Sequence, residues 1–367
     1  SKKMPQVKEQ QHVAKVKINR PFSLLGENVG VGERKTLALE AAKLYTHSPL
    51  NIPIEVVNGV MEGPVLMVCA AIHGDELNGI EIISRVINSK SIKTMKGTLI
   101  AVPFVNGYGV LSQSRYLPDR RDLNRSFPGT KKGSLAGRIA HLFLNEIVAK
   151  CDYGIDLHTG AIHRTNLPQI RAVLADDEIK ELSLAFGAPV VLNAPLREGS
   201  LRESAAQTNT KILLYEAGEA LRFDEISIRA GVSGIINVMR KIKMLPRSRK
   251  LVKLEPAIAH SSQWIRASQS GILRATNPMG HRVNIGDVLG YISDPFGGDA
   301  EVEVIAPLSG MVIGRATLPL VHEGEAIFHM AIFDELSDAE SAYETFHSNV
   351  DPDDSEIQTN DGEPVIY

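Results

Sequence analysis

Two continuous apolar runs constrain the fold of this chain more than any other feature. The first is VLMVCAA at residues 65–71, and the second is TLIAVPFV at residues 98–105. Runs without polar alternation indicate strands that are buried on both faces. A helical pattern separates them, with Ile80, Ile83 and Ile87 on one side. Strand, helix and strand in this order favour an α/β sheet covered on both faces.

The same alternation continues to about residue 250. The expected further strands lie at residues 36–44, 52–58, 153–157 and 211–215, and the expected further helices at residues 135–148, 178–186, 201–207 and 226–245. Such alternation over this length predicts one α/β domain at residues 1–250, in which residues 1–50 could be an N-terminal extension.

The texture of the sequence changes at about Pro256. Short β-like runs then alternate with glycine, Asn-Pro and Asp-Pro turns, which indicates a small all-β domain at residues 256–335. Residues 336–367 are expected to form an acidic tail. From Asp334 onward there are 11 acidic residues and no Lys or Arg, with almost no apolar periodicity. This segment is therefore predicted to be solvated or weakly docked.

The charge and the cysteines bound the class of protein. The net charge is −3 at pH 7, so the part before the acidic tail is net positive. That surplus suits a small anionic substrate but is too small to indicate nucleic acid binding. No apolar run reaches the ~18 residues of a membrane span and no signal peptide is evident, so we expect a cytoplasmic protein. Cys69 and Cys151 are predicted to be buried free thiols, with a single bridge as the alternative.

Three candidate metal ligands follow the ends of two expected strands. His73 and Glu76 follow the first apolar run, and His158 follows the strand at residues 153–157. Because the carboxyl ends of strands in an open α/β sheet collect ligands at one edge, these side chains can converge. Two histidines and one glutamate are a known ligand set of catalytic zinc. Each short motif also recurs by chance, so the hypothesis depends on what lies between and after them.

A loop rich in arginine lies between these motifs. Its basic members, together with one asparagine, are Arg115, Arg120, Arg121, Arg125 and Asn124. Guanidinium groups beside a metal cation are unfavourable unless an anion joins them, and arginine suits bidentate recognition of carboxylates. The loop therefore indicates an anionic substrate, with an ordinary solvated basic loop as the alternative.

A further carboxylate follows the strand expected at residues 211–215. Glu216 would lie at the end of that strand, and a carboxylate near a metal can take a proton from metal-bound water. Glu219 competes for this role, and either glutamate could be an ordinary turn residue. Asp156 or Asp75 could orient a ligand histidine through its second ring nitrogen.

Taken in order, these motifs resemble those of the succinylglutamate desuccinylase/aspartoacylase family, a branch of the zinc carboxypeptidase superfamily. The motifs are H-x-x-E, D-L-N-R-x-F-P-G, D-L-H-T-G and E-x-G, and the likeness spans roughly residues 60–335. The resemblance implies a zinc-carboxypeptidase-like α/β fold, with an open twisted mixed sheet and helices on both faces. It also implies a small C-terminal all-β, barrel-like domain, which could be a lid over the active site.

The resemblance also implies the metal centre and the base. His73, Glu76 and His158 match the ligands of one Zn²⁺ per chain, and Glu216 matches the general base.

It further implies the substrate-binding side. Asn124 and Arg125 match the pair that grips the carboxylate of the substrate. Arg115 resembles an arginine that polarises the scissile carbonyl, and Arg121 is the alternative. The remaining candidates on the acid-binding side are Arg171 and Arg202.

The combined prediction is a zinc-dependent hydrolase that cleaves the amide bond of an N-acyl amino acid or a related small carboxylate. A small-peptide carboxypeptidase is the alternative within hydrolases, because the same ligands and carboxylate clamp would serve it. A non-catalytic pocket protein of the same fold is the alternative from another class, although the presence of Glu216 argues against it. The expected partner is a small anionic, acyl-amino-acid-like molecule, without nucleic acid or membrane, and a homo-oligomer is possible.

Overall fold

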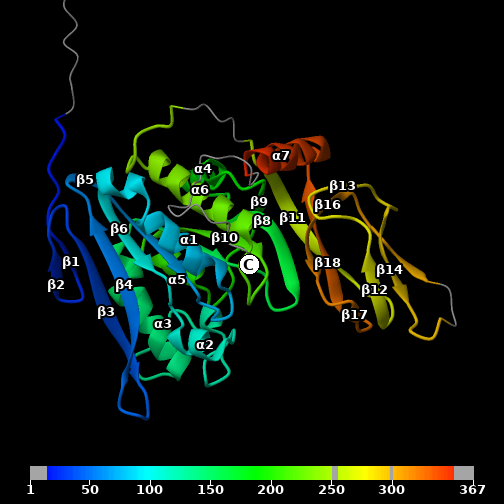
Figure 1. The fold of residues 1–367 in the computed structure, drawn as a ribbon, viewed down its shortest axis with the longest axis horizontal. Helices are drawn as coiled ribbons and strands as arrows, with labels where there is room; N and C mark the ends of the chain where they lie inside the picture. The colour runs from blue at the N-terminus through cyan, green and yellow to red at the C-terminus, as the bar shows by residue number, and fades with distance from the viewer. Residues whose placement is uncertain (1–14, 250–254, 298–300, 351–367) are drawn as a thin grey trace, which may run out of the picture.

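A twelve-stranded sheet with parallel and antiparallel pairs runs through the molecule (Figure 1). The structure is a computed structural model that describes residues 15–249, which we call the first region, and residues 255–297 and 301–350, which we call the second region. In spatial order, the first region contributes β3 (Arg34–Lys43), β4 (Pro49–Asn58), β6 (Lys96–Val102), β5 (Met61–Ala70), β7 (Tyr153–His158), β10 (Lys211–Gly218), β8 (Arg164–Ala172) and β9 (Val190–Asn193). The predicted mixed α/β class is confirmed.

Helices pack on both faces of this sheet. The apolar side chains of β5 alternate between two separate clusters, with Leu66 and Val68 in one and Met67 and Cys69 in the other. The first cluster holds residues of α1 (Asn78–Ile87), α4 (Asp177–Phe186) and α6 (Glu225–Lys241), and the second holds residues of α3 (Leu135–Glu146) and α5 (Leu201–Gln207). The short helix α2 (Gly107–Ser112) and the hairpin of β1 (Phe22–Leu24) and β2 (Glu27–Val29) complete this region.

The second region continues the same sheet. It adds β11 (Ala257–Arg266), β18 (Ala326–Phe333), β16 (Gly310–Ala316) and β13 (Arg282–Val283) beyond β9. A separate four-stranded sheet is formed by β15 (Val302–Ile305), β14 (Val288–Ser293), β12 (Gly271–Ala275) and β17 (Leu320–Val321). In Figure 1 these strands, coloured yellow to red, lie at the end of the molecule opposite the blue N-terminal strands.

Five strands close into a ring across the two regions. The pairs are β8–β9, β9–β11, β11–β18, β18–β16 and β16–β8. Each of the five strands places apolar side chains in one shared cluster, which includes Leu167, Val190, Ala257, Met311 and Ala331. The barrel-like element therefore takes two strands from the first region, which differs from the self-contained β domain expected from the sequence.

The beginning of the acidic segment is a packed helix. Leu336–Asn349 forms α7, whose buried residues are Ala339, Ala342 and Phe346. The expectation of a solvated or weakly docked segment is thus wrong for this part. Phe346 lies in the cluster that holds α1, α4 and α6, and Ala339 and Ala342 lie in the cluster of the five-stranded ring. Residues 351–367 lie outside the described residues.

Two further expectations bear on the core and on membranes. Cys69 and Cys151 are buried free thiols, as predicted, and burial raises the pKa of both.

Across the described ranges, none of the helices has both the length and the apolar character needed to cross a bilayer.

Candidate metal centre and active site

The candidate ligands lie where neighbouring parallel strands end. β5, β7 and β10 are adjacent and parallel. His73 and Glu76 follow β5, His158 ends β7, and Glu216 on β10 lies beside His158 in the register. Parallel neighbours bring their carboxyl ends to the same edge, so residues far apart in the sequence meet there.

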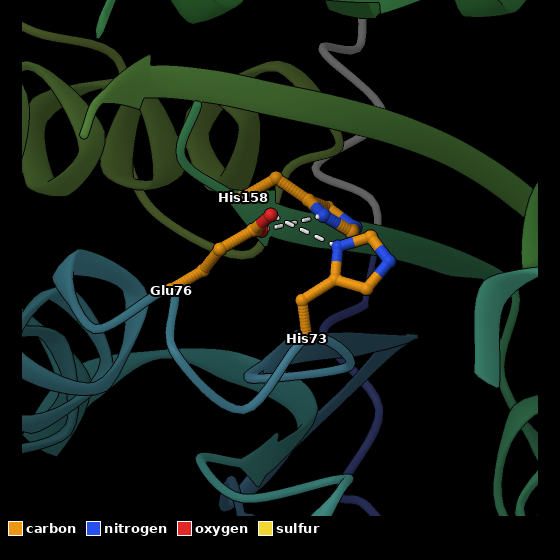
Figure 2. Close-up of side chains that lie close together, drawn as sticks. All are labelled: His73, Glu76 and His158. Carbon is orange, nitrogen blue, oxygen red and sulfur yellow. Dashed lines mark hydrogen bonds and ion pairs between the residues drawn. The ribbon is translucent and has the colours of Figure 1, made fainter. Parts of the chain in front are cut away.

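Figure 2 shows His73, Glu76 and His158 pointing toward one another. One potential ligand atom from each lies within 4.8 Å of the others. The Glu76 carboxylate bridges the two rings, with 2.9 Å from Oε1 to Nδ1 of His73 and 2.9 Å from Oε2 to Nδ1 of His158. All three side chains are buried. The structure thus brings the three predicted ligands together.

The far side of each imidazole meets a second carboxylate. Nε2 of His158 lies 2.8 Å from Asp156 Oδ2, and Nε2 of His73 lies 2.9 Å from Asp122 Oδ1. Asp156, and not Asp75, is therefore the acid behind His158. Asp122 was absent from the sequence-based candidates, although it is the first residue of the D-L-N-R motif and its spacing from the histidine gave no signal.

The cluster carries more carboxylates than imidazoles. Burial alone would lower the pKa of His73 and His158, but the neighbouring carboxylates, chiefly Glu76 for His73 and Asp156 for His158, raise both. Burial likewise opposes charge on Glu76, yet the two histidines hold its pKa well below the usual range. A divalent cation at the two Nδ1 atoms and Glu76 would balance this buried negative charge. The donor set, with an acid on each Nε2, fits a metal such as zinc.

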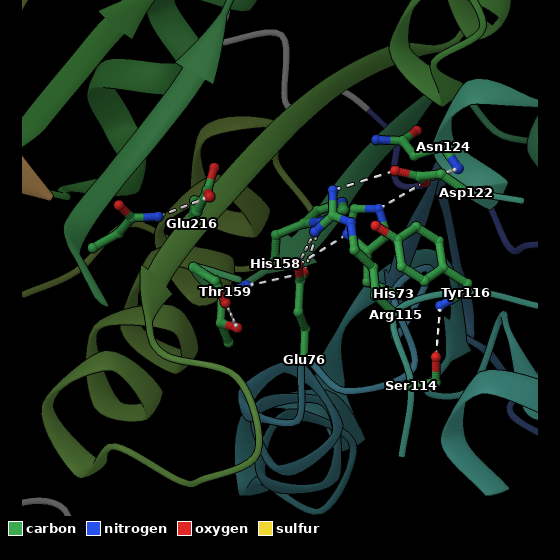
Figure 3. A network of polar contacts seen from close by, with 12 residues as sticks. His73, Glu76, Ser114, Arg115, Tyr116, Asp122, Asn124, His158, Thr159 and Glu216 are labelled. Atoms are coloured by element: carbon green, nitrogen blue, oxygen red, sulfur yellow. Dashed lines mark hydrogen bonds and ion pairs between the residues drawn. The ribbon is translucent and has the colours of Figure 1, made fainter. Parts of the chain in front are cut away.

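One arginine of the loop reaches the ligand cluster (Figure 3). Arg115 Nη1 lies 3.4 Å from Glu76 Oε1, and Arg115 Nη2 lies 3.3 Å from Asp122 Oδ2. Arg121, the alternative, has a side chain that is 63% exposed and lies 3.9 Å from Asp119. The geometry therefore places Arg115, and not Arg121, beside the candidate metal ligands.

Asn124 and Arg125 lie in a short 3₁₀ turn that packs against the start of α5. Asn124 Oδ1 accepts a hydrogen bond from the backbone N–H of Leu201 at 2.9 Å. Arg125 Nη1 donates to the Asn124 carbonyl at 2.7 Å. Among the residues the structure describes, no carboxylate lies at ion-pair distance from Arg125, and burial lowers the pKa of this guanidinium. A cation placed this way suits an anionic guest.

Arg202, the second residue of α5, has the same character. Burial lowers its pKa to about 10. Its only hydrogen bond among the described residues runs from Nη1 to the Ala194 carbonyl at 3.4 Å. Arg171, the other candidate named from the sequence, is instead paired with Glu216, with 3.1 Å between Nη1 and Oε2. Arg202 is thus the candidate that keeps its charge available.

The two competing glutamates have different surroundings. The Glu216 side chain is 15% exposed, and Oε1 accepts a hydrogen bond from Asn166 Nδ2 at 2.8 Å. Glu219 is more deeply buried and accepts a hydrogen bond from the Thr317 hydroxyl, and its other oxygen lies 3.2 Å from Arg222 Nε. Glu219 is therefore tied to the second region, whereas Glu216 lies beside His158 in the pairing of β10 with β7.

Comparison with known proteins addresses the family. The family model of the succinylglutamate desuccinylase/aspartoacylase catalytic domain matches residues 62–242. The chain belongs to the succinylglutamate desuccinylase/aspartoacylase family. A curated relative, N-alpha-acetyl-L-2,4-diaminobutyric acid deacetylase from Halomonas elongata, is 28% identical over 289 residues, which are 75% of this chain and 84% of the relative.

Solved structures show the same fold. A succinylglutamate desuccinylase/aspartoacylase from Rhodobacter sphaeroides is 25% identical, with a TM-score of 0.72 over 82% of this chain and 96% of that chain. The product-bound ectoine utilization protein EutE (DoeB) from Ruegeria pomeroyi is 23% identical, with a TM-score of 0.73 over 82% of this chain and 95% of that chain.

The extent of these matches separates the two regions. All seven site residues predicted from the sequence lie within the part matched by the desuccinylase/aspartoacylase catalytic domain, which ends before the second region. The structural matches cover more of the chain than that domain does. The match that identifies the family therefore lies wholly in the first region. How the second region affects the candidate site is seen only in the contacts between the two regions.

Proposed function

We propose that this protein is a zinc-dependent deacylase that hydrolyses the amide bond of an N-acyl amino acid. The observation that carries the proposal is the buried cluster of His73, Glu76 and His158, with Glu216 on the adjacent strand end. The deacetylase from Halomonas elongata, whose name describes an acetylated amino acid as substrate, supports this substrate class.

In this proposal, Nδ1 of His73, Nδ1 of His158 and the Glu76 carboxylate would hold one Zn²⁺. The bound metal would supply an acidified water and a polarised substrate carbonyl. Asp122 and Asp156 accept hydrogen bonds from the Nε2 atoms and so fix the orientation of both rings.

Two side chains would carry the proton transfer and the developing charge. Glu216 takes a proton from the attacking water and returns it to the nitrogen of the leaving amine. Arg115 turns its guanidinium toward the carbonyl oxygen and stabilises the negative charge that develops there. Its present contacts with Glu76 and Asp122 are at the long end of the range, so the guanidinium can exchange them for a substrate oxygen.

The arginines would bind the acid group of the substrate. Neither Arg125 nor Arg202 has a carboxylate at ion-pair distance among the described residues, and the loop that carries Arg125 packs against the start of α5, the helix that carries Arg202. Asn124 uses its oxygen for the fold and keeps its amide N–H groups for the ligand. Binding the acid group at this edge would hold the amide of the substrate at the metal.

A substrate panel tests the proposal. Zinc-loaded protein is given N-acetyl and N-succinyl amino acids, the same compounds with the carboxylate converted to an amide, and short peptides. We expect the acyl amino acids to be hydrolysed with the highest kcat/KM and the amides to lose most of it. Preference for peptides would instead indicate a carboxypeptidase. No hydrolysis of any compound, with zinc bound, would indicate a non-catalytic protein.

A further inference from the structure

Glu216 is held on both sides by side chains of one strand, β8. Asn166 donates to Oε1 at 2.8 Å, and Arg171 Nη1 lies 3.1 Å from Oε2. β8 runs antiparallel to β10, with Gln169 opposite Glu216, so Asn166 and Arg171 flank the glutamate along the strand. A glutamate side chain has three rotatable bonds, and holding both oxygens removes that freedom before a substrate binds.

The second region lies directly behind Asn166. β16 pairs with β8 to close the five-stranded ring, and Gly314 is the residue opposite Asn166. A Cβ atom at position 314 would lie 2.5 Å from Asn166 Oδ1 and 3.4 Å from the Cβ of His329. The first distance is shorter than van der Waals contact allows, so any side chain at this position must displace the Asn166 amide.

The conflict at position 314 involves only the tip of a side chain. Asn166 can rotate away at little cost to stability, but its Nδ2 would then leave Glu216. The backbone at Gly314 is not in the left-handed region, so the requirement for glycine is one of space. The effect of a substitution should therefore fall on the glutamate and leave the fold intact.

We propose that Gly314 and Asn166 are positioning residues for Glu216, through which closure of the ring by the second region orients the proton acceptor. The proposal rests on the proposed function, because it takes Glu216 as the group that accepts the proton. Gly314 leaves room for the Asn166 amide, Asn166 fixes Oε1, and Arg171 fixes Oε2. The second region thus acts on catalysis without contributing a reacting group.

A double-mutant cycle tests this coupling. Gly314→Ala, Asn166→Ala and the double variant are compared with the zinc-loaded parent, with an N-acyl amino acid as substrate. Misplacing a catalytic group by about 1 Å can cost roughly 100-fold in rate, so we expect each single variant to lose about 10- to 100-fold in kcat. KM and metal content should stay near those of the parent. The double variant should be no slower than Asn166→Ala alone, because alanine at position 166 has no amide oxygen for the new methyl group at position 314 to clash with.

Gly310→Ala is the matched control on the same strand. Its Cβ would lie 2.3 Å from the backbone carbonyl oxygen of Ala331 and would not touch Asn166. We expect this variant to have a lower Tm than the parent. Any change that it makes in kcat should be the same whether residue 166 is asparagine or alanine. Equal loss of kcat from Gly314→Ala in both backgrounds would overturn the proposal. If Gly314→Ala does not fold, the test is the kcat of Asn166→Ala alone. A kcat equal to that of the parent would then overturn the proposal.

A crystal structure of Gly314→Ala separates this inference from the proposed function. If the parent hydrolyses no acyl amino acid, the proposed function fails, but the position of the Glu216 carboxylate can still be compared between the two proteins. A displaced Asn166 with a reoriented Glu216 supports the coupling. An unmoved Glu216 overturns it, whatever the activity of the parent.

Discussion

The two regions of the molecule contribute to the candidate site in different ways. The first region supplies the candidate metal ligands, both acids behind them and the arginines. What the second region supplies, in the described residues, is support: Gly314 leaves space behind Asn166, and Thr317 donates to Glu219. In the proposed coupling, the second region acts on the reaction through packing alone, and the match to the catalytic domain, which ends at residue 242, does not cover that contribution.

The sharpest test of this division is the loss of a ligand from the first region. In His73→Ala, one of three ligands is gone, so we expect no bound zinc and activity at the background level. Metal analysis of protein purified without added metal should give one ion per chain for the parent and none for the variant. The control is His141→Ala, a half-buried histidine on α3 that lies away from the ligand cluster and contacts Asn145, and this variant should keep its metal. Full occupancy of the His73 variant would remove the assignment.

A smaller loss is expected when the proton acceptor is changed but the metal is kept. Glu216→Gln keeps the size of the side chain and removes its basicity, so kcat should fall roughly 10²- to 10⁴-fold with little change in metal content or substrate binding. Steady-state kinetics and calorimetric binding of substrate are the measurements. The matched control is Glu219→Gln, which should affect stability more than kcat because Glu219 joins the two regions. If it proves the more damaging to kcat, the choice of base is wrong.

The anion clamp should respond more mildly still. Arg125→Lys keeps the charge but loses the forked geometry, so we expect KM to rise by about tenfold, which is about 1.4 kcal/mol of binding free energy. Discrimination between a substrate and its carboxamide should narrow at the same time. Arg121→Lys, on the same loop but exposed and near Asp119, should leave both quantities unchanged. A response from Arg121 and none from Arg125 would reverse the assignment.

The smallest effect on activity is expected from a change in the second region, where pH acts on stability. Burial, followed by the charges of Arg171, Arg164 and Arg197, lowers the pKa of His329 to about 3. Unfolded chains protonate histidine near pH 6.5, whereas folded His329 stays neutral, so the free energy of unfolding falls as the pH drops from about 6.5 toward 3. The loss amounts to about 1.4 kcal/mol per pH unit.

His329→Gln should therefore flatten the dependence of unfolding free energy on pH between about 6.5 and 4.5. Urea unfolding at several pH values measures this slope. The comparison is between the slopes of the two proteins, and not between their unfolding free energies at any one pH. An identical slope for His329→Gln and the parent would show that His329 is not kept neutral by its surroundings.

The sequence alone predicted the ligand cluster because its signal is local. His73 and Glu76 follow a strand that is unmistakably apolar, and His158 ends another, so the edge where they meet could be inferred before any pairing was known. Choosing between Arg115 and Arg121 required the loop conformation, which spacing does not encode.

The ring of five strands could not be predicted in the same way. β9 has four residues, which are too few to show a periodicity. β8 does not alternate between polar and apolar residues, because some of its polar side chains contact Glu216. The pairing of β8 with β16 joins segments far apart in the chain, and no local feature specifies such a partner. The docking of α7 was missed because two of its three buried residues are alanines among acidic neighbours.

Closure of the ring by β16 also sets an order of events at the ribosome. β8 leaves the ribosome long before β16 is synthesised, so until then its edge toward Gly314 lacks a partner. The newly made first region is therefore exposed to wrong edge pairing for much of translation, when chaperones would have most to protect. On the proposed coupling, a nascent chain that already holds all three candidate metal ligands still lacks the strand that positions Glu216.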